Sequence, residues 1–141
     1  TGERYSRPMA KAIFRAERKN PIKTTGELME VLKKAVPRKY ESGRLNPGTR
    51  AFLGFRIYVN RELDNLKDIL EVIPEIVASG GRAAVITFQS LEDKIVKEIF
   101  KKQAKEGKAE LLYRKPISPS LQEMRLNPRS RSAKLRAIRV I

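Results

Sequence analysis

Apolar residues recur at helical spacing through the first third of the chain. Between residues 6 and 18 they lie three or four positions apart, which predicts a short amphipathic helix: Met9, Ile13 and Ala16. Thr24 and Glu27 then match a capping box, in which a hydroxyl and a carboxylate satisfy the first backbone N–H groups of a helix. That second helix is expected to stop before Pro37, and the polar stretch 38–45 is predicted to be a loop.

The most regular pattern follows Asn46 and Pro47, a cap residue and a proline suited to the first helical position. Seven apolar residues recur there in steps of three or four: Phe52, Phe55, Val59, Leu63, Leu66, Leu70 and Ile73. This spacing predicts one long amphipathic helix. Pro74 is expected to kink it or to begin a second short helix that ends at Ser79.

The pattern changes after Gly80 and Gly81, which predict a turn. Residues 82–88 form a short apolar run, typical of a strand buried on both faces of a parallel sheet. Ser90 to Asp93 match a second capping box, and the helix after them is expected to end at Gly107. A strand followed by a capped helix predicts an α/β unit, in which ligands bind at the junction of strand and helix.

Two further strands and a short helix complete the expected elements. Residues 109–113 predict a second strand, and Ser118 with Pro119 is expected to cap a helix ending before Asn127. Residues 133–140 begin with alternating apolar and basic positions, which predicts a third, half-exposed strand.

Composition narrows the chemistry. The 141 residues include no His and no Cys, which excludes a Ser-His-Asp or Cys-His catalytic site, a zinc site of Cys and His, and disulfides. No apolar run approaches the roughly 20 residues that span a bilayer, and no signal peptide opens the chain. A cytoplasmic location is therefore expected.

Charge points to a polyanionic partner. The chain holds 31 basic and 16 acidic residues, a net charge of +15. Both ends are basic and the centre, 51–100, is slightly acidic. Clustered Lys and Arg favour nucleic acid because each can displace counterions from a phosphate. A solubilising surface is the alternative, and a membrane surface fits less well because the cations do not oppose one clean apolar helical face.

Five runs of sequence stand out: Gly2-Glu-Arg-Tyr-Ser-Arg7, Asn46-Pro-Gly-Thr-Arg50, Leu53-Gly-Phe-Arg-Ile-Tyr-Val-Asn-Arg-Glu-Leu63, residues 80–97 with Ser90-Leu-Glu-Asp93, and Asn127-Pro-Arg-Ser-Arg-Ser-Ala-Lys-Leu-Arg136. Taken together and in this order, they resemble the RsmH (MraW) family of small-subunit ribosomal RNA methyltransferases.

The resemblance implies transfer of a methyl group from S-adenosylmethionine to the exocyclic amine of a cytidine in 16S rRNA. It implies an α/β fold, the C-terminal part of a Rossmann-like class I methyltransferase sheet with three strands. Residues 1–50 would be part of a helical inserted subdomain on the RNA side. Residues 51–141 would carry the fifth, sixth and antiparallel seventh strands.

The family's N-terminal half, which carries the cofactor loop, has no counterpart here. Accordingly, the sequence contains no G-x-G-x-x-G, and no cofactor-binding residue is assigned. S-adenosylmethionine would be bound mainly by that half, so this chain alone is expected to be incomplete and inactive. Expected partners are small-subunit rRNA or the 30S particle, and the N-terminal half or a second copy of this chain. Gln89 stands where the family usually has His, and Gln cannot shuttle a proton near neutral pH.

Catalytic residues are not assigned. Candidates for the target pocket are Ser90, Glu92 and Asp93 at the expected carboxyl end of the first strand; the alternative is that Ser90 and Asp93 cap the helix and Glu92 complements its dipole. RNA-binding candidates are Arg4, Arg7, Arg50, Arg56, Asn60, Arg129, Ser130, Arg131 and Lys134. The competing hypothesis for the whole chain is a non-catalytic basic RNA-binding module that works alone.

Overall fold

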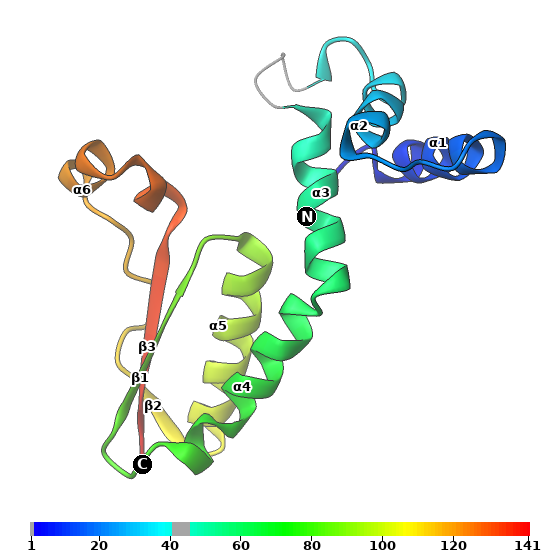
Figure 1. Cartoon of the computed structure of the whole chain (residues 1–141). Coiled ribbons are helices and arrows are strands. Elements are labelled where there is room, and N and C mark those ends of the chain that lie inside the picture. Colours follow the sequence, from blue (N-terminus) through cyan, green and yellow to red (C-terminus); the bar gives the residue numbers. More distant parts are fainter. Residues whose placement is uncertain (1, 41–45) are drawn as a thin grey trace. The chain divides into compact units, whose positions relative to one another are not determined.

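The computed structural model describes residues 2–40 and 46–141, an α/β chain with two compact units, Thr1–Asn60 and Arg61–Ile141 (Figure 1). The units divide at residue 60, whereas the sequence suggested a boundary at residue 50. Their assignment to subdomains of a larger enzyme stays a prediction. Much of the loop expected at 38–45 lies outside the described residues.

The described residues of the first unit form three α-helices: α1 (Ser6–Lys19), α2 (Thr25–Lys34) and α3 (Pro47–Val59). They enclose a small core around Met9, Leu32 and Tyr40. The capping box of α2 is confirmed: the Thr24 hydroxyl accepts the Glu27 N–H at 3.1 Å, and the Glu27 carboxylate accepts the Thr24 N–H at 3.1 Å. These two bonds fix the residue at which α2 begins, and they prevent the helix from extending back toward Pro21.

The prediction of one long helix is wrong. Helix α3 ends at Val59 and α4 (Glu62–Ile76) begins after Arg61, whose φ of 52° lies in the left-handed region. Among the described residues Arg61 is the one non-glycine residue with positive φ. In the sequence, the helical spacing of apolar residues was unbroken here only because Val59 lies at the expected position. In the structure Val59 is 76% exposed, so it is not part of a buried face. The periodic spacing of apolar residues therefore predicted one helix where the structure has two, each of which buries a face of its own.

Pro74 lies inside α4, which continues to Ile76, so no second helix begins there. Proline lacks an N–H and cannot bond the carbonyl four residues earlier, that of Leu70. The buried Gln103 side chain on α5 (Ser90–Lys105) supplies the missing donor, because its Nε2 lies 2.8 Å from the Leu70 oxygen. A contact between helices thus replaces a hydrogen bond within one helix.

The second unit contains a three-stranded sheet in the order β1-β3-β2. Strand β3 (Lys134–Val140) lies between β1 (Arg82–Thr87) and β2 (Ala109–Leu111) and is antiparallel to both. All three strands lie close to their predicted positions. The register pairs Arg82 with Arg139 and Thr87 with Lys134.

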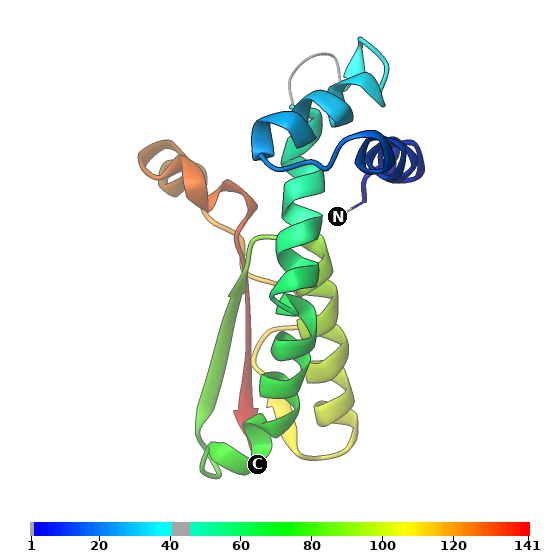
Figure 2. The same ribbon diagram turned by 45° about the vertical axis from the view of Figure 1, so that its right-hand side comes forward.

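Helices α4 and α5 pack on the same face of this sheet, as both views of the ribbon show (Figures 1 and 2). The core between them includes Leu70, Val96, Phe100 and Ile138. On β1 the residues of the other face are exposed, with Ile86 at 58%. The expectation of a strand buried on both faces of a parallel sheet is therefore wrong for this chain.

A short peripheral segment precedes β3. Helix α6 (Leu121–Leu126) is capped by Ser120, not by Ser118 as predicted, since the Ser120 hydroxyl accepts the Glu123 N–H at 3.1 Å. The 3-10 helix η2 (Pro128–Ser132) follows it and leads into β3. No helix in the described part of the chain is long and apolar enough to cross a membrane.

Candidate functional site

The N-terminus of α5 follows directly from the carboxyl end of β1. Gln89 is the cap residue and Ser90 is the first residue of the helix. The Glu92 carboxylate accepts the backbone N–H groups of Phe88 and Gln89, each at 3.1 Å. The interpretation of Ser90 and Asp93 as the capping pair is therefore wrong. The cap residue is Gln89, one position earlier, and the Glu92 carboxylate accepts its backbone N–H.

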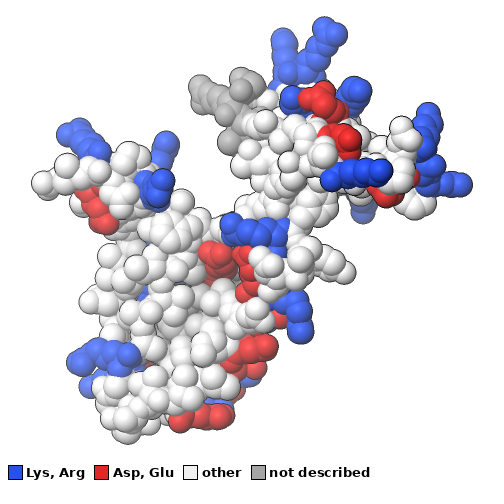
Figure 3. Space-filling model, viewed as in Figure 1, with Lys and Arg blue, Asp and Glu red and all other residues white. Residues whose placement is uncertain are grey.

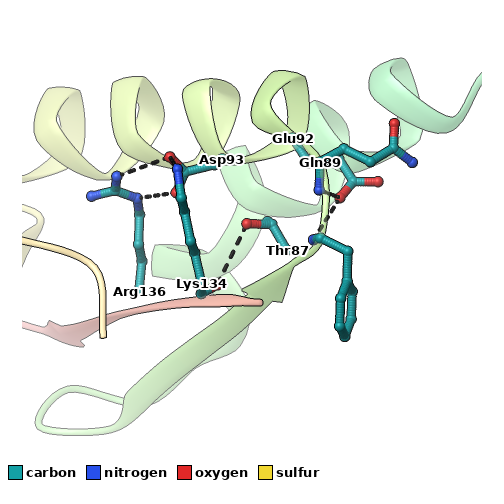
Figure 4. Close-up of polar contacts among 7 residues, drawn as sticks. Thr87, Gln89, Glu92, Asp93, Lys134 and Arg136 are labelled. Carbon is teal, nitrogen blue, oxygen red and sulfur yellow. Dashed lines mark hydrogen bonds and ion pairs between the residues drawn. The ribbon is translucent and has the colours of Figure 1, made fainter. Parts of the chain in front are cut away.

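Asp93 instead connects α5 to β3. Its Oδ1 lies 2.8 Å from Nε of Arg136, and its Oδ2 lies 3.2 Å from Nη2 of Arg136 and 3.3 Å from Nζ of Lys134. Figure 4 shows both cations reaching from β3 to this carboxylate, while the Gln89 side chain points away from the cluster. Lys134 and Arg136 share a face of β3 because they are two positions apart.

Asp93 is only 8% exposed, and its environment favours the ionised form. The hydrogen bond from the Arg136 guanidinium is the largest effect that lowers the pKa of Asp93 below its usual value, and burial opposes it only partly. A carboxylate held in this way accepts hydrogen bonds and does not donate a proton near neutral pH. Its geometry suits a positioning role for the first turn of α5.

The basic segment before β3 is ordered as η2. Ser130 is buried, and its hydroxyl donates to the Asn127 carbonyl oxygen at 2.8 Å. Arg129 and Arg131 are exposed on either side of it. The segment is thus a turn of 3-10 helix in which the Ser130 side chain holds the backbone and the two arginines are exposed.

In the first unit, a buried carboxylate gathers residues from two of the sequence runs described above. The Glu3 side chain is 4% exposed and accepts hydrogen bonds from the Tyr5 N–H, at 2.7 Å, and from the Tyr40 hydroxyl. Nη1 of Arg50 lies 4.0 Å from its Oε2. Sequence reasoning missed Glu3, although its place beside Arg4 in the first run was a usable signal.

Glu3 and Arg50 also border a cavity of about 250 Å³ between α1 and α3. Ser6 is a further polar residue at its border, and the other lining residues are small or apolar: Met9, Ala10, Ile13, Leu32, Ala51, Gly54 and Phe55. A hollow of this kind can hold a small group that is polar at one end.

The remaining candidates of the first unit are Arg4, Arg7, Arg56 and Asn60. Arg4 and Arg7 are exposed at the start of α1. Arg56 is exposed on α3, and Asn60 is the C-cap of that helix, where its N–H donates to the Arg56 carbonyl oxygen at 3.0 Å. Within the second unit the structure therefore brings Asp93 together with Lys134, and within the first unit it brings Arg50 to Glu3.

Comparisons of the sequence with a family model and with individual proteins give the same family. The sequence model of the MraW methylase family matches residues 1–141. The chain is 46% identical to the ribosomal RNA small subunit methyltransferase H of Coprothermobacter proteolyticus, over 97% of this chain and 45% of that protein. It is 47% identical to the enzyme of the same name from Rhodopirellula baltica, over 95% of this chain and 40% of the relative. The chain thus spans less than half the length of these relatives.

Proposed function

Because the chain belongs to the MraW methylase family, we propose that it is the C-terminal part of an enzyme that methylates small-subunit ribosomal RNA. The family match over residues 1–141 is the observation that carries this proposal. The methyl donor is S-adenosylmethionine, and the acceptor is the exocyclic amine of a cytidine in 16S rRNA. This chain supplies RNA-binding and target-pocket elements.

The sheet supports the assignment of the chain to the end of a Rossmann-like methyltransferase domain. In this proposal β1, β2 and β3 are its fifth, sixth and seventh strands, and the antiparallel position of β3 between the other two agrees with that order. Within the described residues β1 has one hydrogen-bonded neighbour, β3. Its other edge is where we place a strand of the N-terminal half.

The residues present do not fit the donor molecule. In Rossmann-type domains the strand that carries a nucleoside-containing cofactor runs into a Gly-rich turn at the start of a helix. Here β1 runs into Phe88, Gln89 and Ser90, whose side chains prevent the close backbone approach that glycine allows. We therefore assign the binding of S-adenosylmethionine mainly to the N-terminal half.

The acceptor sets the task of this chain. The lone pair of the cytosine amine is delocalised into the ring, so the amine is a weak nucleophile that must be held in line with the transferred methyl group. The base must also be unpaired or flipped out of a helix. Ser90 is exposed at the start of α5, just after β1, and is our candidate for a contact with the base, whereas Glu92 and Asp93 hold α5 in place.

Exposed arginines supply the contacts to the RNA backbone. Arg4 and Arg7 in the first unit, and Arg129 and Arg131 on η2, offer planar donor groups that suit phosphate oxygens. Arg50 and Lys134 already contact carboxylates, so their contribution to RNA binding is secondary to holding Glu3 and Asp93.

The test is complementation in trans. The N-terminal half of a relative is mixed with this chain, unmethylated 30S subunits and radiolabelled S-adenosylmethionine, and incorporation into 16S rRNA is counted. Incorporation that needs both polypeptides supports the proposal. Salt-sensitive RNA binding by this chain, without methyl transfer in the mixture, supports a stand-alone RNA-binding module instead.

A further inference from the structure

Helix α1 has two chemically different faces. Met9 is buried, and Ile13 and Ala16 are half-buried where the helix packs on its own unit. Lys11, Arg15 and Arg18 follow at spacings of four and three, so their side chains lie along one stripe on the opposite face. All three residues are exposed.

Among residues 2–40 and 46–141, no acidic side chain is found paired with the cations of this stripe. The single acidic residue of α1 is Glu17, and its carboxylate accepts the Ile22 N–H at 2.9 Å. Figure 3 shows the resulting blue surface over α1.

An aromatic residue lies within the stripe. Phe14 is 65% exposed, and the Arg18 guanidinium carbon lies 5.8 Å from the centroid of its ring. A large apolar ring left in water among cations has no role in the core of the unit. Cations that track a phosphate backbone, with an aromatic ring on which a base can stack, make up the usual surface for single-stranded nucleic acid.

We propose that the outer face of α1 binds single-stranded RNA, with phosphates on Lys11, Arg15 and Arg18 and one base stacked on Phe14. This inference rests on the proposed function only in taking RNA as the partner. An anionic membrane fits less well, because the apolar side of α1 is packed inside its unit and Phe14 alone is presented outward.

The test measures binding of the full 141-residue chain to a fluorescently labelled 12-nucleotide RNA by anisotropy, over a range of salt concentrations. The triple variant Lys11→Gln, Arg15→Gln, Arg18→Gln should bind at least tenfold more weakly. For this variant, the slope of log K against log salt concentration should be less steep by about 2, since each lost phosphate contact reduces the slope by about 0.7. The matched control Lys97→Gln, Lys101→Gln, Lys105→Gln removes the same charge from α5 and should change affinity less than threefold.

A second variant separates stacking from charge. Phe14→Leu keeps an apolar side chain and should weaken RNA binding about tenfold, the effect of losing one stacked base, with the salt dependence unchanged. Its binding to inorganic polyphosphate, which has no bases, should equal that of the unmodified chain. Circular dichroism confirms that each variant is folded.

The outcomes separate this inference from the proposed function. If the unmodified chain binds RNA but the triple substitutions in α1 and in α5 weaken this binding equally, α1 is not the binding surface, while an RNA-binding role for the chain stands. Binding to anionic vesicles through α1, without binding to RNA, overturns the inference in favour of a membrane. If the chain binds no RNA at any salt concentration, the inference fails, and trans complementation then decides whether the proposed function fails too.

Discussion

Asp93 and Arg136 are 43 residues apart in the sequence, yet they form a two-point ion pair that joins the first turn of α5 to β3, at 2.8 and 3.2 Å. Both side chains are almost buried, so neither can exchange this contact for water without a local opening of the structure. The pair therefore fixes where α5 begins relative to the sheet, and with it the position of Ser90.

Replacing Asp93 by Asn should destabilise the second unit by about 2–4 kcal/mol. The change keeps the shape but leaves Arg136 nearly buried without its counter-charge, which is the costly way to break such a pair. Urea unfolding, followed by hydrogen exchange of the α5 amides, measures the loss. Glu98→Gln, which removes an exposed carboxylate from the same helix, is the control and should cost under about 1 kcal/mol. Equal losses in both variants would contradict a special role for Asp93.

The contact between Asp93 and Arg136 also predicts that the stability of the fold depends on pH in the acidic range. Because the pKa of Asp93 is lowered in the folded chain, mainly by the Arg136 hydrogen bond, ionised Asp93 stabilises the fold above its unfolded pKa of about 3.9. This stabilisation is lost as the pH falls through the lowered folded pKa. Melting temperatures between pH 6 and pH 2 should fall less steeply for Asp93→Asn than for the unmodified chain. Parallel curves would show that Asp93 does not contribute.

The Gln103 contact should be coupled to Pro74. Gln103→Leu removes the donor to the Leu70 carbonyl and should cost about 1–2 kcal/mol. In a Pro74→Ala background the helix regains an N–H for that carbonyl, so the same change should cost less than half as much. A double-mutant cycle in urea measures this coupling. Additive effects would mean that Gln103 does not compensate for the proline.

The open edge of β1 should make the chain self-associate when it is alone. An edge strand with an exposed apolar residue, here Ile86, is a template for another strand. Sedimentation should show a mean mass that rises with protein concentration, and Ile86→Lys should reduce the rise. Leu121→Lys, on α6 away from this edge, should leave it unchanged. A monomer at every concentration would contradict the prediction.

Short-range signals were predicted well from the sequence. The α2 capping box needs only Thr24 and Glu27, three residues apart, and both of its bonds are present. The strands β1 and β3 also lie where apolar runs indicated them. Such features depend on neighbours in the chain, which a sequence displays directly.

Features that depend on distant residues could not be predicted in this way. Asp93 resembled a cap because its partner Arg136 lies far along the chain, on strand β3. Glu3 was overlooked because the Tyr40 hydroxyl that bonds it comes from 37 residues away. The break at Arg61 was hidden because hydrophobic spacing records which side chains are apolar, not which of them are buried.

Each hydrophobic core is built from residues on one side of Arg61: Met9, Leu32 and Tyr40 before it, and a larger set from Leu70 to Val140 after it. Two cores assembled independently need not melt together. A single midpoint from a heating curve would then average two transitions, and a mutation in one core could escape notice if the signal comes from the other. Thermodynamic work on this polypeptide therefore calls for probes that report on each half separately.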